Sequence, residues 1–201
     1  KDLVAEFGTV VPQWYAGECP LVDGDLAIVG TGGKAILAAF DLATGKVKWT
    51  TPNPRGYQMT HSSPIVTTLG GVKQYVFCAS GGVVGVAADD GRLLWECRDW
   101  TVSTANIPTP LDIGDGRLFL CGGYSAGAMM LKVEKNGSSF TAKSLYRLPP
   151  TTFGSDQQTP ILFQGHIYGV VPNGQLVCLT LDGKVAWSSG TANRFGLGAY
   201  V

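Results

Sequence analysis

The sequence lacks an excess of either charge, because its 201 residues include 15 Lys and Arg against 15 Asp and Glu. Nucleic-acid binding and polybasic membrane anchoring both need a surplus of basic residues, so both are disfavoured. The chain also has no apolar run near the roughly 18 residues that span a membrane. Charged residues make up only 15% and apolar residues 45%. This balance predicts a folded chain rather than a disordered one.

Helical periodicity is missing as well. No window of a dozen residues places apolar side chains at i, i+3, i+4 and i+7. The 28 glycines and 11 prolines interrupt helices, whereas short strands joined by tight turns accommodate them. The sequence therefore predicts an all-β fold.

Metal-binding patterns are scarce. There are two histidines, no CxxC and an odd number of cysteines, five, so we expect no zinc site. Cys78, Cys121 and Cys178 lie within apolar stretches, which favours buried free thiols over a disulfide scaffold.

The chain instead contains a repeat built around a turn glycine and a tryptophan four residues later. The pairs are Gly45 with Trp49, Gly91 with Trp95, and Gly183 with Trp187. The separation of the last two tryptophans is twice the 46 residues that separate the first two. A copy without Trp is expected between them, where Leu145 or Tyr146 could take its place.

A proline precedes the first strand of each repeat, at Pro20, Pro64, Pro110 and Pro160. Four short strands follow it, with Asn-Gly, Asp-Gly or Thr-Gly at the last hairpin. Repeated four-stranded units of this length predict β-propeller blades. We expect a single propeller domain over 1–201, with blades at about 17–57, 58–104, 105–153 and 154–190, and a further blade starting at 191–201.

These residues resemble the PQQ-like, or quinoprotein-type, β-propeller family, a WD40-like architecture. The docking motif of that family is complete in the first repeat, as Ala39, Asp41, Thr44, Gly45 and Trp49. The resemblance implies that the tryptophans Trp49, Trp95 and Trp187 pack between adjacent blades and are largely buried.

Both ends of the chain are expected to be parts of further blades. Residues 2–8 are interpreted as the last strand of a preceding blade, and 195–201 as the first strand of a following one. The sequence has no starting Met, and propellers of this family usually have seven or eight blades. We therefore expect about four blades of a longer propeller. The open blade faces should be covered by the remaining blades of the parent chain or by self-association.

Two glycine-rich segments imitate catalytic motifs. The run 123–127 matches the G-x-S-x-G of serine hydrolases, and 30–35 matches a dinucleotide-binding pattern. Both motifs require a helix after the turn, whereas here an expected strand follows each of them. We interpret both as hairpins between strands.

Binding residues are expected at the channel rim, where the connections between blades and the middle hairpins meet. The candidates are polar or aromatic residues that precede the first strand of each blade, namely Trp14, Glu18, His61, Ser62, Asn106, Gln157 and Gln158. The alternative interpretation is that they only hydrate the channel and satisfy strand ends. No catalytic or metal-ligating residue is predicted.

The resemblance implies two functions. One is a binding or scaffold propeller of the bacterial envelope, periplasmic or secreted, with a protein partner or a small polar ligand and no cofactor. The other is part of a PQQ- and calcium-dependent alcohol or sugar dehydrogenase. Enzymes of this kind carry adjacent cysteines and a set of Glu, Asn and Asp around calcium. This sequence has no adjacent cysteines, and Glu18 and Asn106 are isolated candidates for calcium ligands, so the missing blades would have to hold the rest. The first function is favoured.

Overall fold

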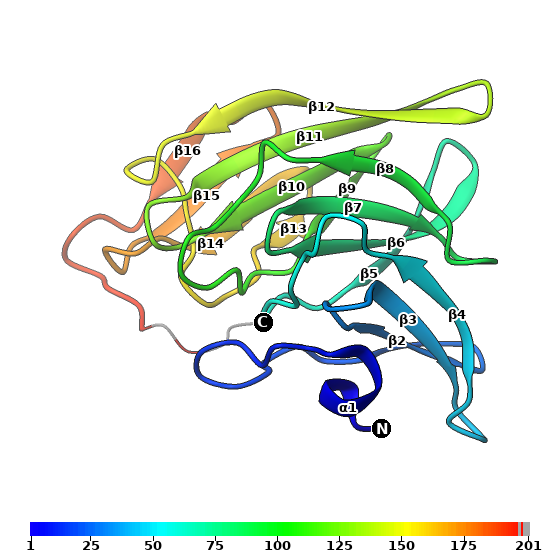
Figure 1. Cartoon of the computed structure of the whole chain (residues 1–201). Helices are drawn as coiled ribbons and strands as arrows, with labels where there is room; N and C mark the ends of the chain where they lie inside the picture. Colours follow the sequence, from blue (N-terminus) through cyan, green and yellow to red (C-terminus); the bar gives the residue numbers. More distant parts are fainter. Residues whose placement is uncertain (197, 199–201) are drawn as a thin grey trace.

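The protein forms four four-stranded antiparallel sheets preceded by one short helix, in a computed structural model that describes residues 1–196 and 198 (Figure 1). Every sheet pairs its strands in chain order, so each is a meander. The prediction of an all-β propeller built from four-stranded blades is confirmed. The first blade consists of β1 (Leu21–Asp23), β2 (Leu26–Gly30), β3 (Ala35–Asp41) and β4 (Val47–Pro52).

The other three blades repeat this arrangement, and Figure 1 shows them following one another along the chain. The second blade consists of β5 (Ile65–Leu69), β6 (Val72–Ala79), β7 (Gly82–Ala87) and β8 (Leu93–Cys97). The third consists of β9 (Leu111–Gly114), β10 (Arg117–Gly122), β11 (Gly127–Asn136) and β12 (Ser139–Leu148). The fourth consists of β13 (Ile161–Phe163), β14 (His166–Val170), β15 (Leu176–Thr180) and β16 (Val185–Ser188).

Both glycine-rich segments are hairpins between strands, as predicted. The run 30–35 joins β2 to β3, and 123–127 joins β10 to β11. No helix follows either turn, so neither segment has the backbone that a nucleophile elbow or a dinucleotide site requires.

A β-bulge recurs at the same place in all four blades, between the third and fourth strands. The pairing shifts directly after Ala39↔Trp49, Gly85↔Trp95, Met130↔Tyr146 and Cys178↔Trp187. A bulge leaves one extra residue on one strand and locally reorients its neighbours. The four aromatic residues therefore occupy one structural position, and Tyr146 replaces the missing tryptophan.

At two of the three blade junctions, the aromatic residue contacts the turn glycine of the next blade. A Cβ on Gly91 would collide with the indole of Trp49, and one on Gly183 would lie 2.9 Å from the Tyr146 ring. Both glycines have positive φ, 74° and 83°, which other residues rarely adopt. Glycine is thus required at this turn for two reasons: the backbone has a positive φ, and the approaching ring leaves no space for a Cβ.

Burial at this position differs from one blade to the next. Trp95 is 4% exposed and Trp49 is half-buried, but Trp187 is 46% exposed. The expectation that all three are largely buried is wrong for Trp187, because no described blade follows β16 to cover its ring.

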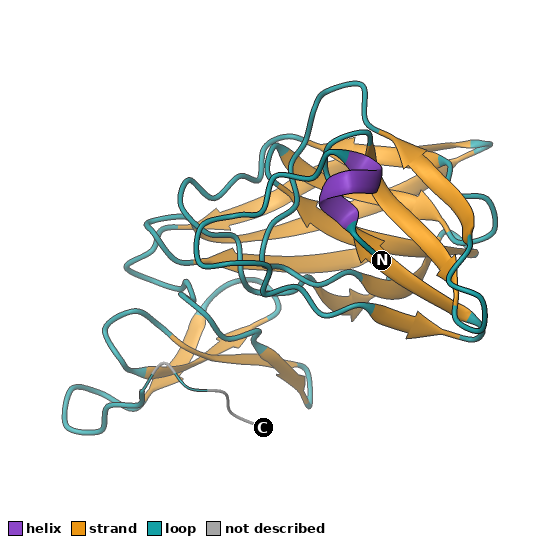
Figure 2. Ribbon diagram, turned by 60° about the horizontal axis from the view of Figure 1, so that its bottom comes forward, coloured by secondary structure: helices purple, strands orange, loops and turns teal. Residues whose placement is uncertain are grey.

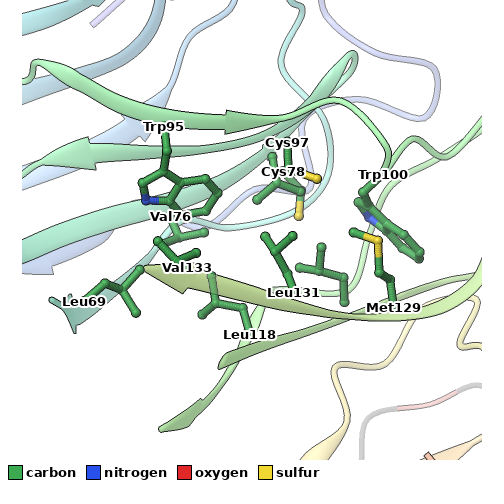
Figure 3. Close-up of a cluster of buried hydrophobic side chains, with 12 residues drawn as sticks. Leu69, Val76, Cys78, Trp95, Cys97, Trp100, Leu118, Met129, Leu131 and Val133 are labelled. Carbon is green, nitrogen blue, oxygen red and sulfur yellow. The ribbon is translucent and has the colours of Figure 1, made fainter. Parts of the chain in front are cut away.

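The largest apolar cluster lies between the second and third blades. Trp95 from β8 meets Leu118 from β10 and Leu131 from β11, with Cys78 and Cys97 beside them (Figure 3). Four cysteines are buried and Cys19 is exposed, and none of the five forms a disulfide. The four buried thiols therefore pack as small apolar groups, as predicted for Cys78, Cys121 and Cys178.

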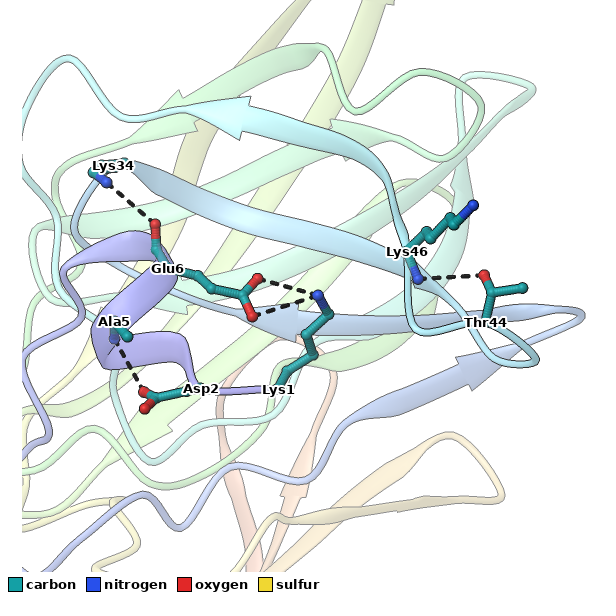
Figure 4. Close-up of polar contacts among 7 residues, drawn as sticks. All are labelled: Lys1, Asp2, Ala5, Glu6, Lys34, Thr44 and Lys46. Atoms are coloured by element: carbon teal, nitrogen blue, oxygen red, sulfur yellow. Dashed lines mark hydrogen bonds and ion pairs between the residues drawn. The ribbon is translucent and has the colours of Figure 1, made fainter.

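Residues 3–7 form the helix α1 (Leu3–Phe7) and not the predicted strand of a preceding blade. The Asp2 side chain accepts the amide of Ala5 at 3.0 Å, and Gly8 ends the helix with φ 68° (Figure 4). These caps satisfy backbone groups that a helix leaves unpaired. The sequence interpretation overlooked them.

Helix α1 covers the face of the first blade that points away from the second. Phe7 packs edge-on against Phe40 and contacts Ala35 and Ala38. Lys1 pairs with Glu6 at 3.2 Å (Figure 4). The Lys1 Cε also lies 3.9 Å from the position that a Cβ on Gly45 would take. Gly45 is the turn glycine equivalent to Gly91, so Lys1 lies near the place that an aromatic ring occupies at Gly91 and Gly183.

The further strand expected at 195–201 falls partly outside the described residues, which omit 197 and 199–201. Residues 195, 196 and 198 are not in a strand. Within the described residues, no helix has the length and apolar character needed to cross a membrane.

Candidate binding rim

One end of the sheets carries the long connections between blades together with the hairpins that join each second strand to its third (Figure 2). This end is the rim from which the sequence predicts binding. The connections are 53–64, 98–110 and 149–160, and the run 8–20 leads into the first blade in the same way.

Ser62 belongs to a set of hydrogen bonds that tie one connection to the next. Its hydroxyl donates to the Pro108 carbonyl at 3.1 Å, and its side chain is fully buried. The amide of His61 donates to the Asn106 carbonyl at 3.1 Å. Ser62 therefore holds adjacent blades together and is not available to a ligand.

Hydroxyl groups make a related bond at two other junctions. The amide of Cys19 donates to Ser63 Oγ, and the amide of Thr109 donates to Thr159 Oγ1, both at 2.9 Å. Each donor precedes the proline that begins a blade. This repetition fixes the spacing of the blades at the rim.

Gln158 is also a structural residue. Its buried side chain donates to the carbonyls of Gly196 and Gly198 at 3.1 Å and accepts from Ser155 Oγ at 3.2 Å. Its neighbour Gln157 is exposed. Only Gln157 of this pair can meet a partner without breaking internal bonds.

Glu18 lies over the beginning of the β2–β3 hairpin. Its Oε1 accepts the amide of Gly30 at 2.5 Å, whereas Oε2 is buried without a hydrogen-bond partner among the described residues. Burial raises the pKa of Glu18 to about 8, against a smaller lowering effect from the Gly30 bond. The carboxyl is therefore mostly protonated at neutral pH.

The Asn106 side chain is 4% exposed, and neither its nitrogen nor its oxygen has a hydrogen-bond partner among the described residues. It lies with Ser62 beside the Cys78 thiol, whose pKa burial raises to about 12. Two buried amide atoms without partners are costly. The sequence suggested a polar residue here but not that it lies beside a thiol.

Calcium does not fit these residues. The ion takes six to eight oxygen ligands, with ionised carboxylates among them. One Glu18 oxygen, Oε1, is already bonded to the Gly30 amide. The described residues contain no group of three or more His, Cys, Asp or Glu that could hold a metal. Glu18 and Asn106 do not form a ligand set.

Trp14 lies in an exposed turn, 12–15, which we call the aromatic turn. Trp14 is 59% exposed and Tyr15 is 82% exposed. Their φ angles are 65° and 69°, a conformation that is unusual for bulky residues. The sequence interpretation chose Trp14 but missed Tyr15, although the adjacent aromatic pair was a readable signal.

His61 supports the aromatic turn from the next connection. Its Nε2 lies 2.8 Å from the Gln13 carbonyl, and the Tyr15 amide donates to the Pro12 carbonyl at 3.1 Å. The imidazole also packs against Gly17, where a Cβ would lie 3.3 Å from Cδ2. The rim thus brings Trp14 and His61 together, and Ser62 with Asn106, while Gln157 and Gln158 lie at the fourth blade.

Comparison with solved structures shows the fold. BamB from Moraxella catarrhalis aligns with a TM-score of 0.61 at 16% identity, over 87% of this chain and 53% of BamB. The β-propeller domain of Cps50 (Swd1) from Myceliophteria thermophila aligns at 0.57 and 13% identity, over 90% and 56%. This chain therefore spans about half the length of these proteins.

A quinohemoprotein alcohol dehydrogenase from Comamonas testosteroni also aligns, with a TM-score of 0.51 at 13% identity, over 90% of this chain and 35% of the enzyme. No curated protein sequence matches the chain. The profile of the family described as outer membrane protein assembly factor BamB matches residues 2–189. Because that match covers nearly the whole chain, the protein belongs to this family of PQQ-like β-propellers.

Proposed function

We propose that this chain is a non-catalytic binding module that holds a protein partner at its rim through the aromatic turn. The exposure of Trp14 and Tyr15 on a supported turn carries this proposal. Large aromatic side chains at the centre of an interface provide much of its binding energy, and each loses little conformational entropy when bound.

The surroundings of the turn support a protein partner over a small molecule. Val10 and Val11 are 61% and 47% exposed, so the apolar surface continues along the chain from the two aromatic residues. An exposed apolar surface of this kind suits another protein, whereas small ligands need concave sites. His61 and the internal turn bond hold the surface in place, which reduces the entropy lost on binding.

Family membership supports a place in the bacterial cell envelope, periplasmic or secreted, because the family is described as an outer membrane protein assembly factor. We propose that this propeller needs no cofactor. A PQQ- and calcium-dependent dehydrogenase would require calcium ligands other than Glu18 and Asn106. At 13% sequence identity, the similarity to the alcohol dehydrogenase concerns the fold alone.

The partner can be tested by placing a photo-crosslinking phenylalanine analogue at Tyr15, and at the exposed Leu145 of β12 as a control. In cells of the organism that makes the chain, we expect one discrete crosslinked product from position 15 and none from 145. Trp14→Ala should reduce that product at least severalfold. Equal products from both positions, or no effect of Trp14→Ala, would contradict the proposal.

The catalytic alternative has a separate test. The chain is supplied with PQQ, calcium and an electron-accepting dye, and simple alcohols and sugars are added. We expect no dye reduction above that of PQQ without protein. Protein-dependent reduction with any of these substrates would favour the dehydrogenase.

A further inference from the structure

We propose that a groove between the third and fourth blades binds the cationic side chain of a Lys or Arg in an extended segment of a partner protein. The groove has a volume of about 410 Å³ and lies at the same rim as the aromatic turn. Its lining includes four residues that could contact such a side chain, Tyr124, Pro150, Asp156 and Pro172. We call it the rim groove.

Three short turns form its walls. The β10–β11 hairpin closes with the amide of Ala126 on the Gly123 carbonyl at 2.9 Å. The connection after β12 turns at Pro149, whose carbonyl accepts the Thr152 amide at 2.9 Å, and the fourth blade turns at Val171, whose carbonyl accepts the Gly174 amide at 2.8 Å. Because each wall is closed by its own bond, the groove needs little rearrangement to accept a ligand.

Asp156 gives the groove its charge. It is the only charged residue among those that line the groove, and its carboxylate forms no hydrogen bond or ion pair with any other described residue. Arg194 packs against Gly174 at the neighbouring turn, but it does not pair with Asp156. A half-buried carboxylate without a cation is complementary to a ligand that brings one.

Gly123 allows the carboxylate to lie where it does. Any Cβ on Gly123 would collide with Asp156, whose backbone and side chain both lie against this glycine. The Ser155 amide holds the connection to the hairpin through the Gly122 carbonyl at 3.3 Å. The acidic group is therefore built into the junction and is not a loosely placed surface residue.

Tyr124 and the prolines suit the rest of a long basic side chain. The Tyr124 ring is 40% exposed, and Tyr124 and Ser125 have φ of 53° and 67°. Such angles are uncommon for residues other than glycine and often mark functional turns. An aromatic face attracts a cation, and proline surfaces can pack against the methylene groups of Lys or Arg.

The experiment uses the whole 201-residue chain labelled with ¹⁵N and three blocked tripeptides, acetyl-Ala-X-Ala-amide. X is lysine, arginine or norleucine, which has an apolar stem and no charge. We expect the lysine and arginine peptides to shift the amide signals of Tyr124, Ser125 and Asn173. Added salt should weaken this binding.

Two variants and a matched control locate the site. Asp156→Asn should weaken lysine-peptide binding about fivefold, as for a partly exposed ion pair, and Tyr124→Ala about threefold. Asp115→Asn, at an exposed turn of the third blade between β9 and β10, should leave binding unchanged. The amide spectrum shows whether each variant remains folded.

Three results would overturn the proposal: equal binding of the norleucine peptide, unchanged affinity in Asp156→Asn, or no shift in the groove at about 10 mM peptide. The rim groove lies at a different blade junction from the aromatic turn. The two tests are therefore independent. The crosslinking test at Tyr15 can fail while the rim groove still binds the lysine peptide, and the peptide test can fail while Tyr15 is still crosslinked to a partner.

Discussion

At the scale of single residues, Glu18 makes the stability of the protein depend on pH. Burial raises its pKa from 4.5 to about 8. Between these values the folded protein holds a proton that the unfolded chain releases. The contribution of Glu18 to stability is thus complete below pH 4.5, and it falls as the pH rises towards 8, with a slope of at most about 1.4 kcal/mol per pH unit.

We predict that Glu18→Gln removes this slope, because the amide oxygen can still accept from Gly30 while the titrating group is lost. The measurement is urea unfolding of both proteins at several values between pH 5 and 8. Glu134→Gln, at an exposed position of β11, is the control and should keep the slope. An unchanged pH dependence in Glu18→Gln would show that burial does not hold the proton.

The rim could be located from the sequence, because prolines and strand periodicity mark where each blade begins. The roles of its residues could not. Ser62 and Gln158 carry the same kinds of group that bind ligands, yet their partners are backbone carbonyls and a serine that only the folded chain brings near. The roles proposed for Tyr15 and Asp156 depend on their exposure and on neighbours from other segments of the chain. Sequence periodicity gives no information about either.

At the scale of elements, the bulge decides which side chain reaches the next blade. In β12 the extra residue is Leu145, so Leu145 is 54% exposed and Tyr146 contacts Gly183. Sequence spacing alone left these two residues as alternatives. A shift of one residue in the pairing register moves the following side chains of a strand to the opposite face of the sheet. A bulge produces such a shift.

We predict that Tyr146→Ala lowers the free energy of unfolding by about 2 kcal/mol, because a half-buried ring is lost with its bond to the Leu181 carbonyl. Leu145→Ala should change it by less than about 0.5 kcal/mol, as for an exposed residue. Denaturant unfolding of both variants measures the difference. Comparable losses of unfolding free energy in the two variants would show that Tyr146 is not the residue that packs at the junction.

Helix α1 shows where strand-based prediction fails. Five residues are too short for apolar periodicity to identify a helix, and short helices are unstable alone. Here Asp2 and Gly8 cap the segment while Phe7 packs on Phe40. Tertiary contact therefore decides between helix and strand.

At the scale of the whole molecule, the same motif residue has different energetic weight in different blades. We predict that Trp95→Ala lowers the free energy of unfolding by about 3–5 kcal/mol, as for a buried core aromatic. Trp187→Ala should cost less than about 1 kcal/mol, because its ring is 46% exposed. Urea titrations of the two variants test this. Equal losses of unfolding free energy in the two variants would mean that other residues bury the Trp187 ring in solution.

The contacts between neighbouring blades, which include the aromatic rings against Gly91 and Gly183, also set how cooperatively the chain unfolds. In repeat proteins, stability is a sum of terms within each unit and coupling terms between nearest neighbours. Among the described residues, the second and third blades each contact a blade on both sides, and the first contacts the second blade on one side and helix α1 on the other. The fourth blade contacts only the third, through Tyr146 and its apolar neighbours. Unfolding should thus begin at the fourth blade and move inward one blade at a time, so amide hydrogens of β14 and β15 should exchange with solvent before those of β6, β7, β10 and β11.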